Sequence, residues 1–179
     1  MGSTRNVEVR RATAADVDAI ADAHRDSIQS IGSSFYSLND VAHWQEGIAA
    51  ALYLDAMEGD EVFFVAMATI DGVQVALGFS SDYPIEGATH GTSVYVRGSA
   101  ARRGIGTALL RMAEAHALEN GSERIEIAAS LAGAYFYWAN GYTEVRRGEA
   151  RLTSGHHIAC VFMRKDITFS GGDEPLRHL

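Results

Sequence analysis

The chain has 179 residues, which fits one compact domain, and its 47% hydrophobic and 21% charged residues are typical of a globular protein with a core. Its net charge of −8 argues against a general nucleic-acid binder, because phosphate binding requires a basic face. The single cysteine, Cys160, excludes an internal disulfide and a metal site built from several cysteines.

Neither the start of the chain nor any later stretch carries a membrane or export signal. The first residues lack the apolar segment of a signal peptide, and Asn6 stands where a myristoylation signal needs Ser or Thr. No apolar run approaches the length of a membrane span. We therefore expect a cytoplasmic protein, with residues 1–169 as a single domain and residues 170–179 as a loose tail.

The first half of the chain predicts a strand, two helices and a β-hairpin. Residues 7–10 alternate as a strand does, and Thr13 and Ser37 each begin a capping box that opens a helix. Val41, Trp44 and Ile48 follow the second box at helical spacing. Asp71-Gly72 is a strong hairpin signal between strands expected at residues 62–69 and 74–80.

The second half predicts alternating strands and helices. The clearest helix covers residues 104–119 and ends at Asn120-Gly121. A short helix is expected at residues 132–140, and the expected strands are residues 92–96, 124–130, 142–145 and 158–163, with Gly155 in the last turn. This order predicts a mixed, mainly antiparallel central sheet flanked by helices, in the α/β (α+β) class.

The turn before the longest helix has the features of an anion site. Gly104 and Gly106 lack a Cβ, so an anion can approach the backbone N–H groups closely. Those groups are the unsatisfied donors of a helix start, and the helix dipole adds to their attraction. Arg102 and Arg103 add positive charge at the same place. A pyrophosphate would fit there.

Two common nucleotide motifs are excluded at this turn. A P-loop needs Lys-Ser or Lys-Thr after its last glycine, where this chain has Thr107-Ala108. The dinucleotide fingerprint needs a third glycine, where Leu109 stands, and an acidic residue after the next strand, where Ala128-Ala129 stands.

Two segments resemble the GNAT superfamily of N-acetyltransferases. Ala101-Arg102-Arg103-Gly104-Ile105-Gly106 resembles the family's acetyl-CoA signature Gln/Arg-x-x-Gly-x-Gly/Ala, with Ala101 as the departure. The segment 130–142 resembles the family's Asn-x-x-Ala-x-x-Phe-Tyr-x-x-x-Gly-Phe block, with Ser130 in place of the Asn and Gly133 in place of the Ala. The resemblance implies a GNAT-like fold and direct acetyl transfer from acetyl-CoA in a ternary complex.

The resemblance also implies roles for individual residues. The strand before the glycine turn would offer backbone groups to the pantetheine, and Tyr137 occupies the place of the family's usual acid for the departing thiolate. The implied cofactor-binding residues are Val94, Tyr95, Val96, Arg102, Arg103, Gly104, Ile105, Gly106, Thr107 and Ser130. Family members place their first two helices over the acceptor pocket, so Phe35, Tyr36 and Trp44 are candidates for lining it, or plain core residues.

The general base is not identified by the sequence. Asp82, Glu86 and His90 are expected where the third and fourth strands meet the substrate side, and each could relay a proton through water. We take His90 as the candidate base. Cys160 is expected to be a buried structural cysteine, and His24 and His116 are expected to be core or boundary residues.

The leading hypothesis is an N-acetyltransferase acting on an amine of a small molecule or protein, with acetyl-CoA as co-substrate and no metal. The alternative is a non-catalytic acyl-CoA-binding sensor, and a weaker third is transfer of a longer acyl chain, which a tight pocket around Tyr135 and Trp138 would forbid. Nucleic-acid and membrane partners are not expected. The sequence leaves open the acceptor, acyl length and oligomeric state, a homodimer included.

Overall fold

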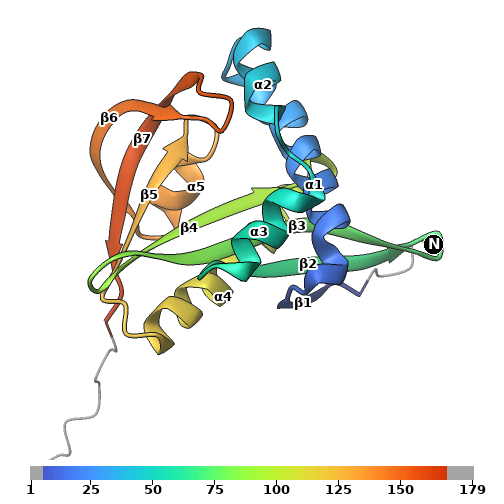
Figure 1. Ribbon diagram of the computed structural model, residues 1–179, viewed down its shortest axis with the longest axis horizontal. Helices are drawn as coiled ribbons and strands as arrows, with labels where there is room; N and C mark the ends of the chain where they lie inside the picture. The colour runs from blue at the N-terminus through green and yellow to red at the C-terminus, as the bar shows by residue number, and fades with distance from the viewer. Residues whose placement is uncertain (1–5, 169–179) are drawn as a thin grey trace, which may run out of the picture.

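A seven-stranded sheet of order β1-β2-β3-β4-β5-β7-β6 forms the centre of the computed structural model, which describes residues 6–168 (Figure 1). Only β4 and β5 pair in parallel, and the other neighbouring strands are antiparallel. This confirms the predicted fold class. The strands are β1 Glu8–Arg11, β2 Val62–Ile70, β3 Val73–Glu86, β4 Thr89–Val96, β5 Arg124–Ser130, β6 Thr143–Arg151 and β7 His157–Asp166.

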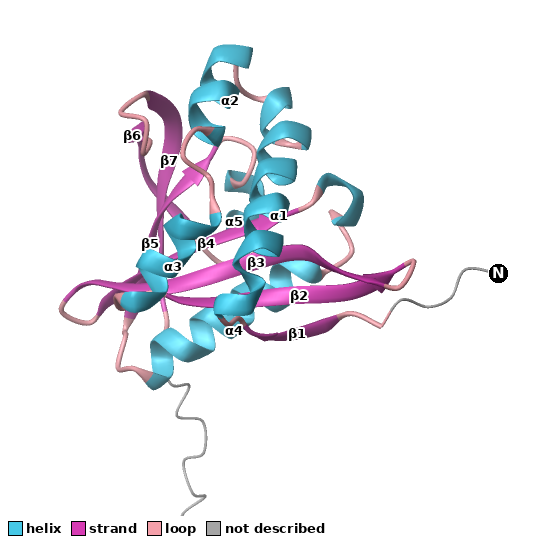
Figure 2. Cartoon of the chain, turned by 45° about the vertical axis from the view of Figure 1, so that its right-hand side comes forward, coloured by secondary structure: helices cyan, strands magenta, loops and turns pink. Residues whose placement is uncertain are grey.

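Helices cover both faces of the sheet (Figure 2). They are α1 Val17–Ser30, α2 Leu38–Gln45, α3 Ala50–Glu58, α4 Ile105–Glu119 and α5 Ala134–Ala139. Alternate residues of β2 serve the two sides: Phe63 and Val65 pack with α1 and α3, whereas Phe64 and Ala66 pack with α4. Because β2 is buried on both faces, it is a continuous apolar run rather than an alternating one.

The predicted capping boxes both form. The Thr13 hydroxyl accepts from the backbone N–H of Ala15, and the Asp16 carboxylate accepts from that of Thr13, although one 3₁₀ turn, Ala14–Asp16, precedes α1. The Ser37 hydroxyl accepts from Asp40 at the start of α2. Arg10 donates two hydrogen bonds of 2.9 Å to Asp16, and this pairing lowers the pKa of Asp16 to about 2.

The structure contains one helix that the sequence analysis missed. Helix α2 ends at Gln45 and Gly47 takes φ +81°, so Ile48 is not on the α2 face where it was expected. The chain then starts α3 from Ala49, which supplies no side-chain cap. Without a capping signal, this helix depends on tertiary packing, in which Tyr53 is buried against α1 and the sheet.

Several strands are longer than predicted, and the hairpin is confirmed. Strand β3 runs on to Glu86 and β4 starts at Thr89, so His90 lies within a strand. Asp71 and Gly72 have φ of 50° and 81°, the two positive values that a type I′ turn requires. The tail predicted at residues 170–179 lies outside the described residues. Among residues 6–168, no helix combines the length and the apolar character needed to cross a bilayer.

Candidate active site

The parallel strands β4 and β5 separate part of the way along their length (Figure 1). Their pairing covers only Thr89–Gly91 against Arg124–Glu126, and beyond Gly91 no ladder joins them within the described residues. A groove of about 910 Å³ opens there. Of the residues that the resemblance implied, it is lined by Val94, Tyr95, Val96, Arg102, Gly104, Gly106, Thr107, Ser130 and Tyr137.

The start of α4 forms one end of this groove. Gly104 is the N-cap residue with φ +79°, and no side chain caps the first N–H groups of the helix. A Cβ on Gly104 would meet nothing within 4 Å, so the space in front of this turn is open. Arg102 also has a positive φ of 60°, rare for a residue with a side chain. The turn thus presents helix N-terminal donors and one arginine to the groove.

Other residues of the same turn serve packing. A Cβ on Gly106 would lie 3.1 Å from Cε2 of Phe136 and 3.5 Å from Cγ2 of Val96, so its absence lets α4 approach α5 and β4. Ile105 is only 8% exposed and packs in the core beneath α4. Arg103 is exposed, and it is not among the residues that line the groove.

Tyr137 lies where the groove passes between β4 and α5. Its side chain is buried between Phe136 and Tyr142, and it lines the groove together with Val94. Burial is the main reason why the pKa of Tyr137 is raised above its usual value of about 10. The hydroxyl therefore keeps its proton near neutral pH, as a proton donor must.

The predicted acceptor-side aromatics have two different positions. Phe35 and Trp44 line the groove, and Phe35 is 53% exposed. Tyr36 does not line it: the Tyr36 hydroxyl accepts from the N–H of Leu131 and donates to the carbonyl of Ala159, both at 2.7 Å. Tyr36 thereby joins the segment between α1 and α2 to the β5 and β7 side of the groove.

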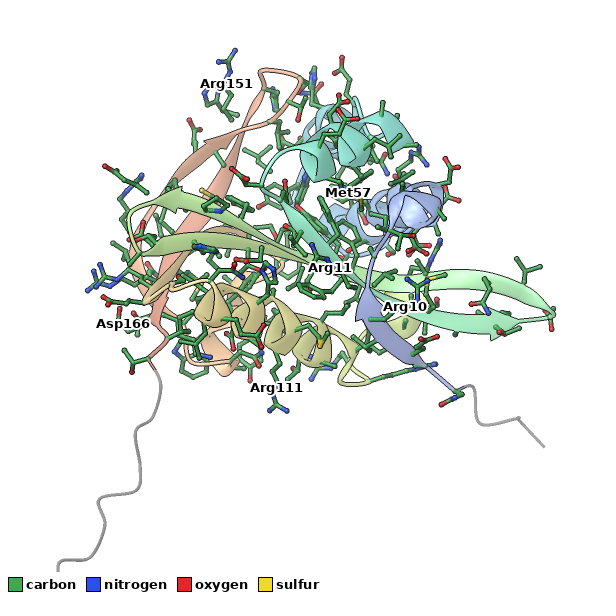
Figure 3. The ribbon with its side chains drawn as sticks, turned by 60° about the horizontal axis from the view of Figure 1, so that its bottom comes forward. Arg10, Arg11, Met57, Arg111, Arg151 and Asp166 are labelled. Atoms are coloured by element: carbon green, nitrogen blue, oxygen red, sulfur yellow. The ribbon has the colours of Figure 1, made fainter. Side chains whose placement is uncertain are left out.

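None of the three base candidates lines the groove. Asp82 is 1% exposed, and its two oxygens lie 2.7 Å from Nδ1 of His90 and 2.6 Å from Nδ1 of His116. Glu86 is exposed at the end of β3. Asp82, His90 and His116 instead line a second cavity of about 630 Å³, together with Arg11 and Met57, which Figure 3 labels. The three candidates, expected where the third and fourth strands meet the substrate side, therefore lie outside the groove, on strands β3 and β4 that extend further than predicted.

Sequence reasoning missed a row of polar side chains across the sheet. Ser93 lines the groove, and its Oγ lies 2.8 Å from Oγ of Ser81, which is fully buried. Glu61, two residues before the β2 partner of Ser81, lies on the same face of the sheet and lines the second cavity. Single serines in strands carry no local signal, and only the strand register brings these residues together.

The groove, the uncapped helix start and the buried tyrosine thus lie together where β4 and β5 separate. The family model described as the acetyltransferase (GNAT) family matches residues 26–142, and the chain belongs to this family. No curated protein matches the sequence.

Solved structures share the fold at low sequence identity. A GCN5-related N-acetyltransferase from Rhodopseudomonas palustris has a TM-score of 0.75 and 22% identity, covering 93% of this chain and 100% of that one. PaiA N-acetyltransferase from Thermoplasma acidophilum, solved with coenzyme A, has a TM-score of 0.70 and 19% identity, covering 90% and 99%. A phosphinothricin acetyltransferase from Sinorhizobium meliloti, solved with acetyl-CoA, has a TM-score of 0.67 and 20% identity, covering 96% and 94%.

Proposed function

We propose that the protein is an N-acetyltransferase that moves acetyl from acetyl-CoA directly to an amine within a ternary complex. The observation that carries this proposal is one continuous groove, which runs from the uncapped start of α4 to the Tyr137 hydroxyl. Family membership supports it, as do similar structures solved with coenzyme A or acetyl-CoA.

The two ends of the groove suit different parts of the co-substrate. The first N–H groups of α4, with Arg102, would bind the pyrophosphate. Backbone groups of Val94–Val96, unpaired with β5, would hold the pantetheine as an additional strand would. Ser130 lines the opposite wall, where its hydroxyl accepts a 3.0 Å hydrogen bond from the N–H of Gly133.

The chemistry needs a proton donor and a proton acceptor. As the carbon–sulfur bond breaks, the thiolate takes the hydroxyl proton of Tyr137, which burial keeps in its protonated form. The attacking amine has to lose a proton, since a free alkylamine has a pKa of about 10. Transfer without an acyl-enzyme is consistent with Cys160, whose thiol pKa burial raises, away from a nucleophile's range.

The lining of the groove favours an acceptor amine with an apolar body. Arg102 is the one charged side chain among the described residues that line it. Toward Phe35 and Trp44 the wall continues with Leu152 and Ile158. A polyamine would find no carboxylate there, whereas an amine carried on an aromatic or aliphatic group would bury apolar surface.

The test is to incubate the protein with acetyl-CoA and an amine panel and to follow the release of free thiol. The panel includes arylalkylamines, amino acids, aminoglycosides, polyamines and peptide N-termini, with propionyl-CoA as a second donor. We expect thiol release with an apolar amine. Acetyl-CoA binding without thiol release for any amine would instead favour the non-catalytic sensor.

A further inference from the structure

A chain of polar side chains leads from the groove through the sheet to the second cavity. Ser93 of β4 lies opposite Ser81 of β3 in the register, on the same face as Tyr95 and Phe79, and the two hydroxyl oxygens are 2.8 Å apart. Ser93 lines the groove, whereas Ser81 is 0% exposed. A proton that Ser81 takes from Ser93 cannot pass directly to solvent, so it must pass to another group within the sheet.

Glu61 is placed to be that neighbour. Phe63 of β2 pairs with Ser81 and Val62 pairs with Asp82, so Glu61, two residues before Phe63, lies on the same face of the sheet as Ser81. The Glu61 side chain lines the second cavity, and among the described residues the Ser81 hydroxyl is a neighbouring polar group that lowers its pKa. Burial raises the pKa of Glu61 above its ordinary value, the Ser81 hydroxyl opposes this, and the charge of Asp82 adds to it.

The groups around Glu61 are consistent with its place as the last proton acceptor in this row of polar side chains. Tyr83 pairs with Gly91, and a Cβ on Gly91 would lie 2.3 Å from the Tyr83 ring. The Tyr83 ring therefore covers the space beside Ser93 and Ser81. Asp60 is exposed. The titratable and charged groups of other elements that face Glu61 or its cavity are Arg11 of β1, Tyr53 of α3, Asp82 and Tyr83 of β3, His90 of β4 and His116 of α4.

We propose that Glu61 is the terminal proton acceptor of the acetyl transfer, reached from the acceptor amine through the hydroxyls of Ser93 and Ser81. The proposal rests on the proposed function. The amine N–H bond breaks as its proton passes to Ser93 Oγ, the Ser93 proton passes to Ser81 Oγ, and the Ser81 proton passes to the Glu61 carboxylate. Three bonds to hydrogen break and three form. The amine nitrogen keeps its electron pair for the carbonyl carbon, and Glu61 then releases the proton to water in the second cavity.

The test compares pH profiles of kcat/KM for the best amine of the panel. Glu61→Gln keeps the shape of the side chain and removes the acceptor, so kcat/KM at pH 7 should fall about 10²-fold, within the range of general base catalysis. The acidic limb of the pH profile, which Glu61 sets in the wild type, should disappear in this variant. Glu61→Asp should restore part of the rate and part of the acidic limb. Acetyl-CoA affinity by calorimetry should stay unchanged.

Glu58→Gln is the matched control, because it removes one negative charge from an exposed residue three positions earlier. It should keep the wild-type profile. The single variant Ser81→Ala should also lower kcat/KM. The double variant with Glu61→Gln should be no slower than the slower single variant, because the two substitutions interrupt the same proton path.

Three outcomes would overturn the path in an active wild type. These are an unchanged pH profile in Glu61→Gln, an equal loss in Glu58→Gln, or additive losses in the double variant. A wild type that releases no thiol with any amine would overturn the proposed function, and the path with it.

Discussion

Tyr137 combines a buried hydroxyl with a position inside the groove, between a strand backbone and a short helix. Its ring packs on Phe136 and Tyr142, which would be enough to explain a core aromatic. Its place in the groove distinguishes it, because Tyr137 lines the groove beside Val94, beyond the point where β4 has left β5. At the scale of the residue, the question is whether this hydroxyl takes part in the transition state.

Tyr137→Phe tests that role. If the hydroxyl protonates the thiolate, kcat and kcat/KM should fall together by about 10²-fold, with little change in coenzyme A affinity. Water can partly replace the donor, because a thiol has a pKa of only about 8.5. The measurements are steady-state kinetics and calorimetric titration with coenzyme A. Full kcat in the variant would make Tyr137 a packing residue.

Cys160→Ala tests the absence of a covalent intermediate. Cys160 is a residue of β7 and is 2% exposed, so the variant should lose some stability and keep most of its turnover per folded molecule. Turnover is measured beside the folded fraction by circular dichroism. A loss of activity far beyond the loss of folded protein would indicate an acetyl-cysteine.

At the scale of the element, the start of α4 and the segment before α2 set the two ends of the groove. Helix α4 comes close to β4 and α5 because Gly106 has no side chain. The segment before α2 is joined across the groove by the Tyr36 hydroxyl. A missing side chain at Gly106 and two hydrogen bonds of Tyr36 therefore set the positions of the helices on either side of the separated strands.

Gly106→Val should weaken acetyl-CoA binding by forcing Phe136 into the groove that it lines. Valine also costs some helix stability, so Arg111→Val on the exposed side of the same helix is the control (Figure 3). Calorimetry should show a higher Kd only for the Gly106 variant. Equal Kd values for the two variants would refute this position for the cofactor.

Tyr36→Phe should loosen the acceptor end without affecting the cofactor end. It leaves the N–H of Leu131 and the carbonyl of Ala159 without their partner, which costs about 1–3 kcal/mol if water does not replace it. We expect a lower free energy of unfolding by urea, a raised KM for the amine and an unchanged Kd for acetyl-CoA. An unchanged amine KM would mean that Tyr36 serves stability alone.

At the scale of the whole molecule, the two helix layers enclose polar groups that couple stability to pH. His24 of α1 lies among Tyr53, Phe79 and Tyr95, where burial lowers its pKa to about 3. The unfolded chain binds a proton at this histidine below pH about 6.5, while the folded protein stays neutral there. The free energy of unfolding therefore decreases as pH falls through this range.

Urea unfolding between pH 7 and 5 measures this coupling. The His24 contribution should fall by at most about 1.4 kcal/mol per pH unit below pH 6.5, and His24→Phe should remove that part of the slope. Asp16 adds a separate loss only at lower pH, between its unfolded pKa near 3.8 and its folded value of about 2. Equal slopes for the variant and the wild type would contradict the buried neutral histidine.

Features whose causes lie within a few residues of one another could be predicted from the sequence alone. The boxes at Thr13 and Ser37, the Asp71-Gly72 turn and the glycine-bearing start of α4 all formed, because caps and tight turns are set by local hydrogen bonds and backbone φ. The order of strands and helices was recovered for the same reason, apart from α3, which has no cap.

The way in which distant segments meet could be read only from the folded chain. The separation of β4 from β5 beyond Gly91, the burial of Asp82 between two histidines and the row from Ser93 to Glu61 all depend on strand register. Register is fixed by the packing of whole faces, and it decides which polar side chains share a face and line the same cavity. For this reason the sequence could indicate a proton acceptor near β3 and β4, but the packed sheet was needed to point to Glu61.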